Sequence, residues 1–256
     1  MPFRRLLVRV ENREVKGPLL EALRRNPIYR FVARCVRPFR KPPDIVVWER
    51  GGRRGCAPHR VKQKTLRAYA KRYRLRVLVE TGTFRGDMVE AMKGEFDRIY
   101  SIELSETLCR TARARFEGAP NVEIIPGDSG IELGQVMRRL GQPAIFWLDG
   151  HYSPGRMVKG ASRGARDTPI LEELHHILGS GSRDHVILID DARCFGADSA
   201  YPTLEALTEI IRSMWSDAEI AVRDDMIRVT PPERRRGWNA LRALGRNAPW
   251  AIGEGR

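Results

Sequence analysis

The strongest constraint on the fold of this chain is an alternation of strand-like and helix-like segments between residues 76 and 215. Short apolar segments (RVLVE, RIYSIEL, VEIIPGD, AIFWLD and VILIDD) are each followed by a longer segment whose apolar residues have helical spacing, such as GDMVEAMKGEF. Strands that are joined through helices favour a parallel sheet, because parallel neighbours need a crossover connection. Helices then cover both faces of that sheet.

Two further strand-like segments, EIAVR and MIRVT, follow the last helix-like segment with only Asp224 and Asp225 between them. Two residues cannot form a crossover helix, so this pair must be an antiparallel hairpin. The sequence therefore predicts an α/β fold: a Rossmann-like, doubly wound, mostly parallel sheet of seven strands with a C-terminal antiparallel hairpin.

Charge divides the chain into three parts. Residues 1–76 contain 23 Lys and Arg against 5 Asp and Glu, and residues 233–256 contain 6 against 2, in a chain of formal net charge +14. Residues 77–232 therefore contain 17 against 25 and are net −8. We predict a basic N-terminal extension over 1–60, a sheet domain over 61–232 and a basic tail over 233–256.

The basic arms suit an anionic partner, such as an acidic membrane surface, a nucleic acid or a charged glycan. Solvated arms without a specific partner would have the same composition, and self-association into a homo-oligomer is also open. We expect a cytoplasmic protein, because no run of about 18 uncharged apolar residues and no signal-peptide pattern occurs. The four cysteines are too scattered for a zinc site and are expected to be reduced.

The first predicted strand leads directly into the loop ETGTFRGD, residues 80–87. Ligands of open parallel sheets bind beyond the carboxyl ends of the strands. Gly82 permits a tight turn in this loop, and Gly86 permits close approach to a ligand at the start of the next helix. Glu80 and Asp87 are acids in the same loop, which disfavours a pyrophosphate and suits a cationic cofactor.

Acidic residues also end the next two strands. Glu103 ends the second strand 23 residues after Glu80, at the place where an acid binds ribose hydroxyls in nucleotide-binding folds. The third strand ends in GDSG, residues 127–130, which offers Asp128 and Ser129 to an adenine. Acids at three consecutive strand ends, with a glycine turn after the first, indicate a cofactor site.

The motifs ETGTFRGD, YSIEL, PGDSG, WLDGH and LIDDA occur in this order before the terminal hairpin. Over about residues 60–230 they resemble class I S-adenosylmethionine-dependent methyltransferases, which implies a methyltransferase enzyme whose domain over 61–232 binds this cofactor. The resemblance implies contacts with the methionine part from Glu80, Gly82, Thr83 and Gly86, with the ribose from Glu103, and near the adenine from Asp128 and Ser129. Asp87 and Asp149 complete the residues that we expect to border the cofactor.

The fourth and fifth strands end in a group of carboxylates, Asp149, Asp190 and Asp191. Neighbouring strands lie about 5 Å apart, so these side chains converge and repel one another. Either arginines such as Arg193 neutralise them, or a hard cation does. Oxygen ligands suit Mg²⁺ or Mn²⁺.

This arrangement resembles the metal-dependent O-methyltransferases, the catechol type and especially those that act on sugars of macrolide and aminocoumarin antibiotics. The resemblance implies that Asp149, Asp190 and Asp191 bind the metal and that His151 lies near the general base. A metal acidifies a bound hydroxyl, and an imidazole can take its proton. Gly150 would let His151 turn back towards the metal. A histidine in a surface turn is the alternative interpretation of His151.

Residues 152–168 are rich in Gly, Ser and Arg and are long for a loop in a compact domain, which predicts a substrate lid. The basic residues of the lid favour an anionic substrate: Arg156, Lys159, Arg163 and Arg166. The remaining histidines have no motif around them and are expected to be structural: His59, His175, His176 and His185.

Three functions remain open at the level of sequence. The first is metal-assisted O-methyl transfer to a hydroxyl of a sugar, a glycan or another small polyhydroxylated molecule. The second is an RNA or protein methyltransferase recruited by the basic arms, although the D/N-P-P-Y motif of amino methylation and an RNA-binding module are missing. The third is a non-catalytic S-adenosylmethionine-binding scaffold, against which the three intact aspartates argue.

Overall fold

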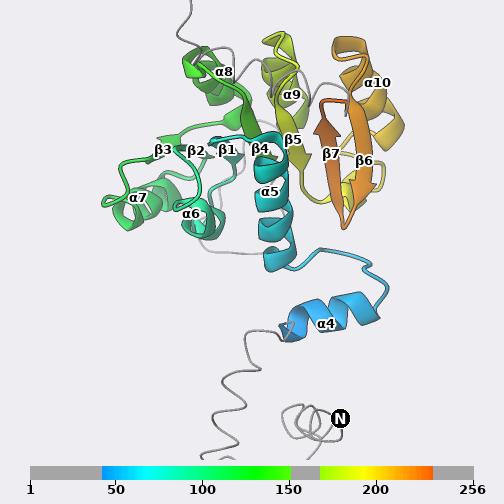
Figure 1. Cartoon of the computed structure of the whole chain (residues 1–256), viewed down its shortest axis with the longest axis horizontal. Coiled ribbons are helices and arrows are strands. Elements are labelled where there is room, and N and C mark those ends of the chain that lie inside the picture. The colour runs from blue at the N-terminus through cyan, green and yellow to red at the C-terminus, as the bar shows by residue number, and fades with distance from the viewer. Residues whose placement is uncertain (1–41, 151–167, 233–256) are drawn as a thin grey trace, which may run out of the picture. The chain divides into compact units, whose positions relative to one another are not determined.

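The structure is a computed structural model that describes residues 42–150 and 168–232 (Figure 1). The chain divides into two compact units, residues 1–50 and 51–256. In the first unit the described residues form the helix α4 (Pro43–Arg50). The boundary predicted at residue 60 stays a prediction, and the predicted basic tail lies outside the described residues.

Seven strands of the second unit form one sheet. They are β1 (Val77–Thr81), β2 (Arg98–Glu103), β3 (Val122–Pro126), β4 (Ala144–Leu148), β5 (Val186–Ile189), β6 (Glu219–Arg223) and β7 (Met226–Thr230). Their spatial order is β3-β2-β1-β4-β5-β7-β6. Strands β1 to β5 pair in parallel, while β7 is antiparallel to both β5 and β6. The predicted sheet and its terminal hairpin are confirmed.

The hairpin turn is made by the two aspartates that the sequence places between the strands. Asp224 and Asp225 have φ angles of 57° and 59°. Two consecutive residues with positive φ form the kind of turn whose twist matches that of an antiparallel pair, and aspartate tolerates this conformation better than most residues. The turn residues therefore fix the register in which Arg223 pairs with Met226.

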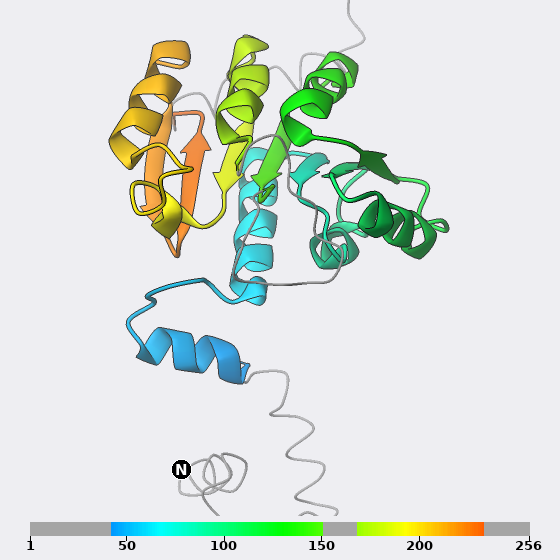
Figure 2. The same cartoon turned by 180° about the vertical axis from the view of Figure 1, so that it is seen from behind.

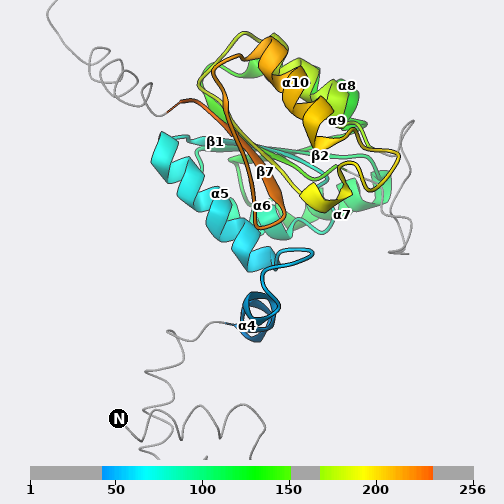
Figure 3. The same cartoon turned by 90° about the vertical axis from the view of Figure 1, so that its right-hand side faces the viewer.

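Helices cover both faces of the sheet. They are α5 (His59–Tyr73), α6 (Asp87–Met92), α7 (Glu106–Arg115), α8 (Ser129–Arg139), α9 (Ile170–Gly179) and α10 (Leu204–Met214), with a short 3-10 turn η2 (Ala192–Cys194). Helices α8, α9 and α10 lie side by side on one face, as the view from behind shows (Figure 2). Helices α5, α6 and α7 lie on the other face (Figure 3).

Alternate residues of each strand point into two separate cores. In β1, Val77 and Val79 pack in the core beneath α8, α9 and α10, and Leu78 packs in the core beneath α5, α6 and α7. Both cores are closed to water, which explains why the central strands are nearly continuous apolar runs. The same alternation assigns the polar residues at the strand ends to one face or the other.

Helix α5 spans His59–Tyr73 and is separated from β1 by three residues. Its buried positions are Lys62, Leu66 and Ala70, which are four residues apart and so form one stripe. A lysine on the buried stripe is unusual, because an ammonium group removed from water needs a partner. In the two described ranges, no helix is long and apolar enough to cross a membrane.

Candidate active site at the carboxyl end of the sheet

The strands end level with one another. In the register of the sheet, Thr81 pairs with Ile102 of β2 and with Leu148 of β4, and Leu148 pairs with Ile189 of β5. The residues at and just beyond these positions therefore share the carboxyl edge, where ligands of open parallel sheets bind. The structure brings five of the predicted acids to this edge: Glu80, Glu103, Asp149, Asp190 and Asp191.

Glu80 is buried in β1 and accepts a hydrogen bond from a short chain of hydroxyls. Ser101 Oγ donates to Glu80 Oε2 at 2.5 Å, and the hydroxyls of Thr83 and Ser101 are 2.6 Å apart. Because the Ser101 proton goes to the carboxylate, Thr83 donates the second bond. Burial raises the pKa of Glu80 to about 8. The hydrogen bond from Ser101 lowers this pKa, and the charges of Asp149 and Glu103 raise it. A positively charged ligand group would favour the ionised form.

Both carboxylate oxygens of Glu103 accept bonds from the backbone. Phe84 N donates to Oε2 at 2.7 Å, and Ser105 N donates to Oε1 at 2.9 Å. Burial raises the pKa of Glu103, and these two bonds oppose that effect. A carboxylate oxygen can accept more than one bond, so each oxygen keeps capacity for another donor. The side chain is held in one orientation that suits two neighbouring hydroxyls.

Two glycines of the loop between β1 and α6 are required by the backbone and by their neighbours. Gly82 has a φ of +81°, and a Cβ there would lie 2.5 Å from the carbonyl oxygen of Asp149. Gly86 has a φ of +75°, and a Cβ there would lie 2.6 Å from the ring of Phe116. Gly82 thus lets the loop touch the end of β4. The close approach at Gly86 is to Phe116, and its predicted ligand contact remains a prediction.

The other predicted cofactor residues have clear local roles. Asp87 opens α6 and forms an ion pair of 2.9 Å with Arg115 at the surface. Asp128 is the N-cap of α8, and its Oδ1 accepts a hydrogen bond of 2.8 Å from Gly130 N. Ser129 is the buried first residue of that helix. These contacts leave the predicted contacts with an adenine or a methionine group untested.

Glu173 is a site residue that our sequence analysis missed. It lies in α9, is 1% exposed, and its Oε1 has no hydrogen-bond partner in the described ranges. A Cβ added at Gly150 would lie 3.1–3.2 Å from Thr81 Oγ1, Ser129 Oγ and Glu173 Oε1. Burial raises the pKa of Glu173 to about 7, against the opposing effect of the Ser129 and Thr81 hydroxyls.

A side chain at Gly150 would therefore press on three oxygen atoms, although the backbone there is outside the left-handed region. Crowding by these oxygens, rather than a special φ, disfavours a side chain at this position. The sequence does contain a signal for Glu173, because it is spaced three residues after Ile170 and four before Ile177, on the apolar stripe of its helix.

Lys62 of α5 is the second missed residue, and it lies among the carboxylates of β4 and β5. Its ammonium donates to Asp190 Oδ2 and lies 3.9 Å from Asp191 Oδ1. Burial alone would lower the pKa of Lys62, but Asp190 and then Asp149 more than offset it and raise the pKa above its usual value. For Asp190, burial raises the pKa, Asp149 adds to this, and Lys62 opposes it.

Arg193 is the second cation of this region. Its Nη1 donates to Asp191 Oδ1 at 2.7 Å and also to Asp225 Oδ2, so that it bridges the end of β5 and the hairpin turn. Arg193 N donates to Asp225 Oδ1 at 2.9 Å, which anchors the same turn to η2. Of the two alternatives that the sequence left open for these aspartates, an arginine partner is present at Asp191.

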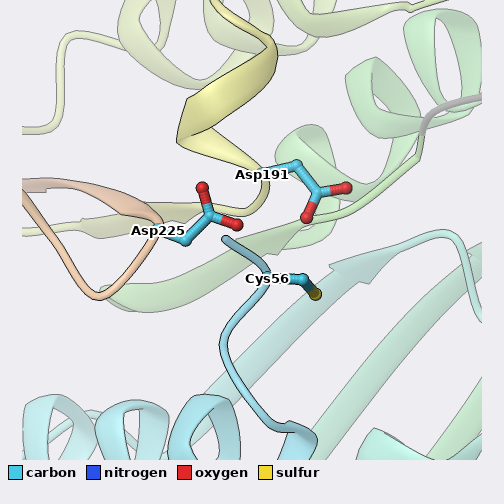
Figure 4. A group of neighbouring side chains, drawn as sticks. All are labelled: Cys56, Asp191 and Asp225. Atoms are coloured by element: carbon cyan, nitrogen blue, oxygen red, sulfur yellow. The ribbon is translucent and has the colours of Figure 1, made fainter. Parts of the chain in front are cut away.

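A group of three potential metal ligands does occur, but with a different composition from the predicted one. Cys56, Asp191 and Asp225 have ligand atoms within 4.8 Å of one another, and no other such group occurs among the described residues (Figure 4). They come from the loop before α5, the end of β5 and the hairpin turn. An exposed thiol is a poor ligand for Mg²⁺, and both carboxylates already bind Arg193.

Several predicted residues lie outside the described residues. They are His151 and the basic residues of the predicted lid, Arg156, Lys159, Arg163 and Arg166. Two histidines that were expected to be structural have structural contacts. His176 Nε2 lies 2.9 Å from Gly130 O, and His185 Nδ1 accepts a bond of 3.1 Å from Ala144 N.

Comparison with known proteins gives structural likeness without sequence likeness. No protein-family model and no curated protein sequence matches the chain. The chain is similar to the SAH-bound methyltransferase PaMTH1 of Podospora anserina, with 16% identity, a TM-score of 0.48, and coverage of 80% of this chain and 94% of that one.

Two O-methyltransferases show similar likeness. The enzyme from Bacillus cereus in complex with SAH has 16% identity and a TM-score of 0.46, covering 78% of this chain and 96% of that one. TomG of Streptomyces achromogenes, involved in tomaymycin synthesis, was solved with SAM. It has 18% identity and a TM-score of 0.45, covering 89% of this chain and 96% of that one.

The chain has the Rossmann-like fold of the class I methyltransferases. This follows from its own strand order, its terminal antiparallel hairpin and the helices on both faces of the sheet, which match what the sequence motifs implied. A fold hosts many activities, so the function must come from the residues at the carboxyl edge.

Proposed function

We propose that the chain is an S-adenosylmethionine-dependent methyltransferase that methylates a hydroxyl of a sugar or another small polyhydroxylated molecule. The observation that carries this proposal is the pair of buried acids Glu80 and Glu103 on adjacent strand ends, each held in place by hydrogen bonds. A ligand with a positive centre and a ribose would match both acids, because the positive centre would lie beside Glu80 and the ribose beside Glu103.

Glu103 would accept hydrogen bonds from the two ribose hydroxyls, one on each oxygen. Hydrogen bonds to a charged acceptor are roughly twice as strong as those between neutral groups. Glu80 lies one strand away on the same face of the sheet, where its negative charge would stabilise a sulfonium or an α-ammonium group. Such a charge would compensate for the burial that now raises the pKa of Glu80.

Methyl transfer is an in-line displacement at the methyl carbon. The bond between this carbon and the cofactor sulfur breaks while a bond to the acceptor oxygen forms, and the acceptor hydroxyl loses its proton. The products are a methyl ether, the demethylated cofactor and a proton. The protein must hold the oxygen opposite the sulfur and provide a base, for which His151, directly after Gly150, is our candidate.

Assistance by Mg²⁺ or Mn²⁺ is the finer part of the prediction from sequence, and the described residues fit it poorly. A metal site needs several oxygens that point to one centre. Here Asp190 binds Lys62 and Asp191 binds Arg193, so protein cations already contact two of the three predicted ligands. The chemistry proposed above therefore involves no step at a metal.

The test uses labelled S-adenosylmethionine with four sets of acceptors: sugars, phenols, RNA and protein. Transfer to sugars or phenols is the expected result. Transfer to RNA or protein alone would favour recruitment by the basic arms. Cofactor binding without transfer to any acceptor would favour the scaffold. Binding of the cofactor is measured separately by calorimetry, and its absence would contradict the proposal as a whole.

A further inference from the structure

We propose that Lys62 takes the place of a divalent cation among the carboxylates of Asp149, Asp190 and Asp191. The native chain then needs no metal ion at this position. The inference deepens the proposed function, on which its meaning for methyl transfer rests. Whether Lys62 or a metal ion occupies this position is a property of the folded chain, so it can be tested without cofactor or acceptor.

The geometry places the ammonium of Lys62 beside Asp190 and Asp191, where a cation bound by both would lie. Its Nζ bonds Asp190 Oδ2 and lies 3.9 Å from Asp191 Oδ1. The side chains of Lys62, Asp190 and Asp191 are 10%, 1% and 8% exposed, so their contacts are largely shielded from water. Breaking a buried charge pair by removing one partner is costly, because the other charge is left uncompensated.

The position of Lys62 in its helix shows why this lysine needs the aspartates. It is on the buried stripe of α5 with Leu66 and Ala70, and α5 packs on β4 and β5. An apolar residue would be the ordinary choice there. A buried ammonium without a counter-charge would strongly destabilise the fold, so Lys62 and Asp190 form one unit.

Existing bonds also limit what a metal ion could use. Asp190 Oδ2 accepts from Lys62, and Asp190 Oδ1 accepts from Asp191 N at 2.9 Å. Asp191 Oδ1 accepts from Arg193 at 2.7 Å. A divalent ion would have to displace these donors and would remain next to a fixed ammonium of the same sign. The native arrangement thus opposes a metal ion by both geometry and charge.

Removal of the Lys62 charge should reverse this preference. Without the ammonium, three clustered carboxylates lose a counter-charge, and a divalent cation becomes the simplest compensation. Lys62→Ala is therefore expected to create a site for Mn²⁺ that the native chain does not have. A merely structural role of Lys62 would lower stability without creating metal affinity.

The experiment measures Mn²⁺ binding by electron paramagnetic resonance, and melting temperature with and without MnCl₂. We expect no stoichiometric Mn²⁺ binding and no change in melting temperature for the native chain. Lys62→Ala should melt at a lower temperature and recover about 5–10 °C at a hundredfold excess of Mn²⁺ over its Kd. NaCl of equal ionic strength should not reproduce this recovery.

Two further variants keep the test decisive. Lys64→Ala removes an exposed lysine of the same helix and should behave like the native chain. Lys62→Arg retains the charge and should also bind no Mn²⁺, even if Lys62→Ala does not fold. Stoichiometric binding of Mn²⁺ by the native chain or by Lys62→Arg would overturn the proposal. So would folded Lys62→Ala that fails to bind Mn²⁺, because Lys62 would then not be what excludes the metal.

Discussion

Glu80 and Ser101 lie directly opposite each other in the register of β1 and β2, and the Ser101 hydroxyl donates a 2.5 Å hydrogen bond to the Glu80 carboxyl. Despite this bond, burial raises the pKa of Glu80 to about 8. A large fraction of Glu80 is therefore protonated at neutral pH. A positive charge bound beside Glu80 would lower its pKa, so that Glu80 would then be ionised at neutral pH.

The first prediction concerns the pH dependence of cofactor binding. A positive group beside Glu80 would lower its pKa, so binding of S-adenosylmethionine below pH 8 should release a proton, and affinity should rise as pH approaches 8. Calorimetry in buffers of different ionisation enthalpy measures this proton. Glu80→Gln should abolish the release, whereas Glu106→Gln at the exposed start of α7 should retain it. An unchanged release in Glu80→Gln would show that another group ionises.

The same pKa shift has a consequence for stability. The folded state keeps the Glu80 proton up to about pH 8, whereas the unfolded chain loses it near the ordinary value of 4.5. Between these values the folded state binds more protons, so the free energy of unfolding should fall as pH rises. The melting temperature of Glu80→Gln should fall less steeply over this range. Glu173 contributes with the same sign, so part of the slope should remain.

The second prediction tests the ribose assignment of Glu103. Glu103→Ala removes a charged acceptor and should weaken S-adenosylmethionine binding by about 1.5–3 kcal/mol. The same change leaves the amides of Phe84 and Ser105 without their carboxylate, so a melting curve must accompany the calorimetry. Glu106→Ala, three residues along the chain and exposed, is the matched control. Equal affinity of Glu103→Ala and native chain would remove Glu103 from the site.

The sequence could predict the fold because its signals are local. A two-residue connection permits only a hairpin, and the strands between helices permit a parallel sheet. Glu80 and Glu103 could be found in the same way, because they stand at the ends of strands. Lys62 and Glu173 could not be assigned to the site from their helices, since a charged residue on an apolar stripe reveals its partner only when the helix is packed. The contact between Gly86 and Phe116 could not be predicted either, because these residues are far apart in the sequence and meet only in the folded chain.

The third prediction compares two glycines with similar backbone angles. Gly82 and Gly55 have φ values of +81° and +71°, so alanine at either position adopts a strained backbone conformation. At Gly82 the new Cβ would also meet Asp149 O at 2.5 Å, whereas nothing lies within 4 Å at Gly55. Gly82→Ala should therefore destabilise the chain by about 1–3 kcal/mol more than Gly55→Ala in denaturant unfolding. Equal losses would mean that the loop and the end of β4 move apart freely.

The fourth prediction concerns the basic N-terminal extension. Deletion of residues 1–50, which form a unit of their own, should leave cofactor affinity unchanged. Association with anionic vesicles or with nucleic acid should weaken, and the association of the full chain should fall with added salt. Flotation and filter binding at two salt concentrations measure this. If the full chain binds neither at low salt, the arms have no anionic partner of these kinds.

The last prediction concerns the proton of the acceptor. His151 follows Gly150, which lies beside the oxygens of Thr81, Ser129 and Glu173. If His151 removes the hydroxyl proton, His151→Ala should retain cofactor affinity and lose about 10²- to 10⁴-fold in rate. The rate should recover partly as pH rises, because the acceptor hydroxyl then ionises without a base. His175→Ala, which removes an exposed histidine of α9, is the control and should keep the native rate at all pH values. If His151→Ala keeps the native rate, His151 is not the base and the alternative of a histidine in a surface turn holds. The base would then lie among the acids of the carboxyl edge.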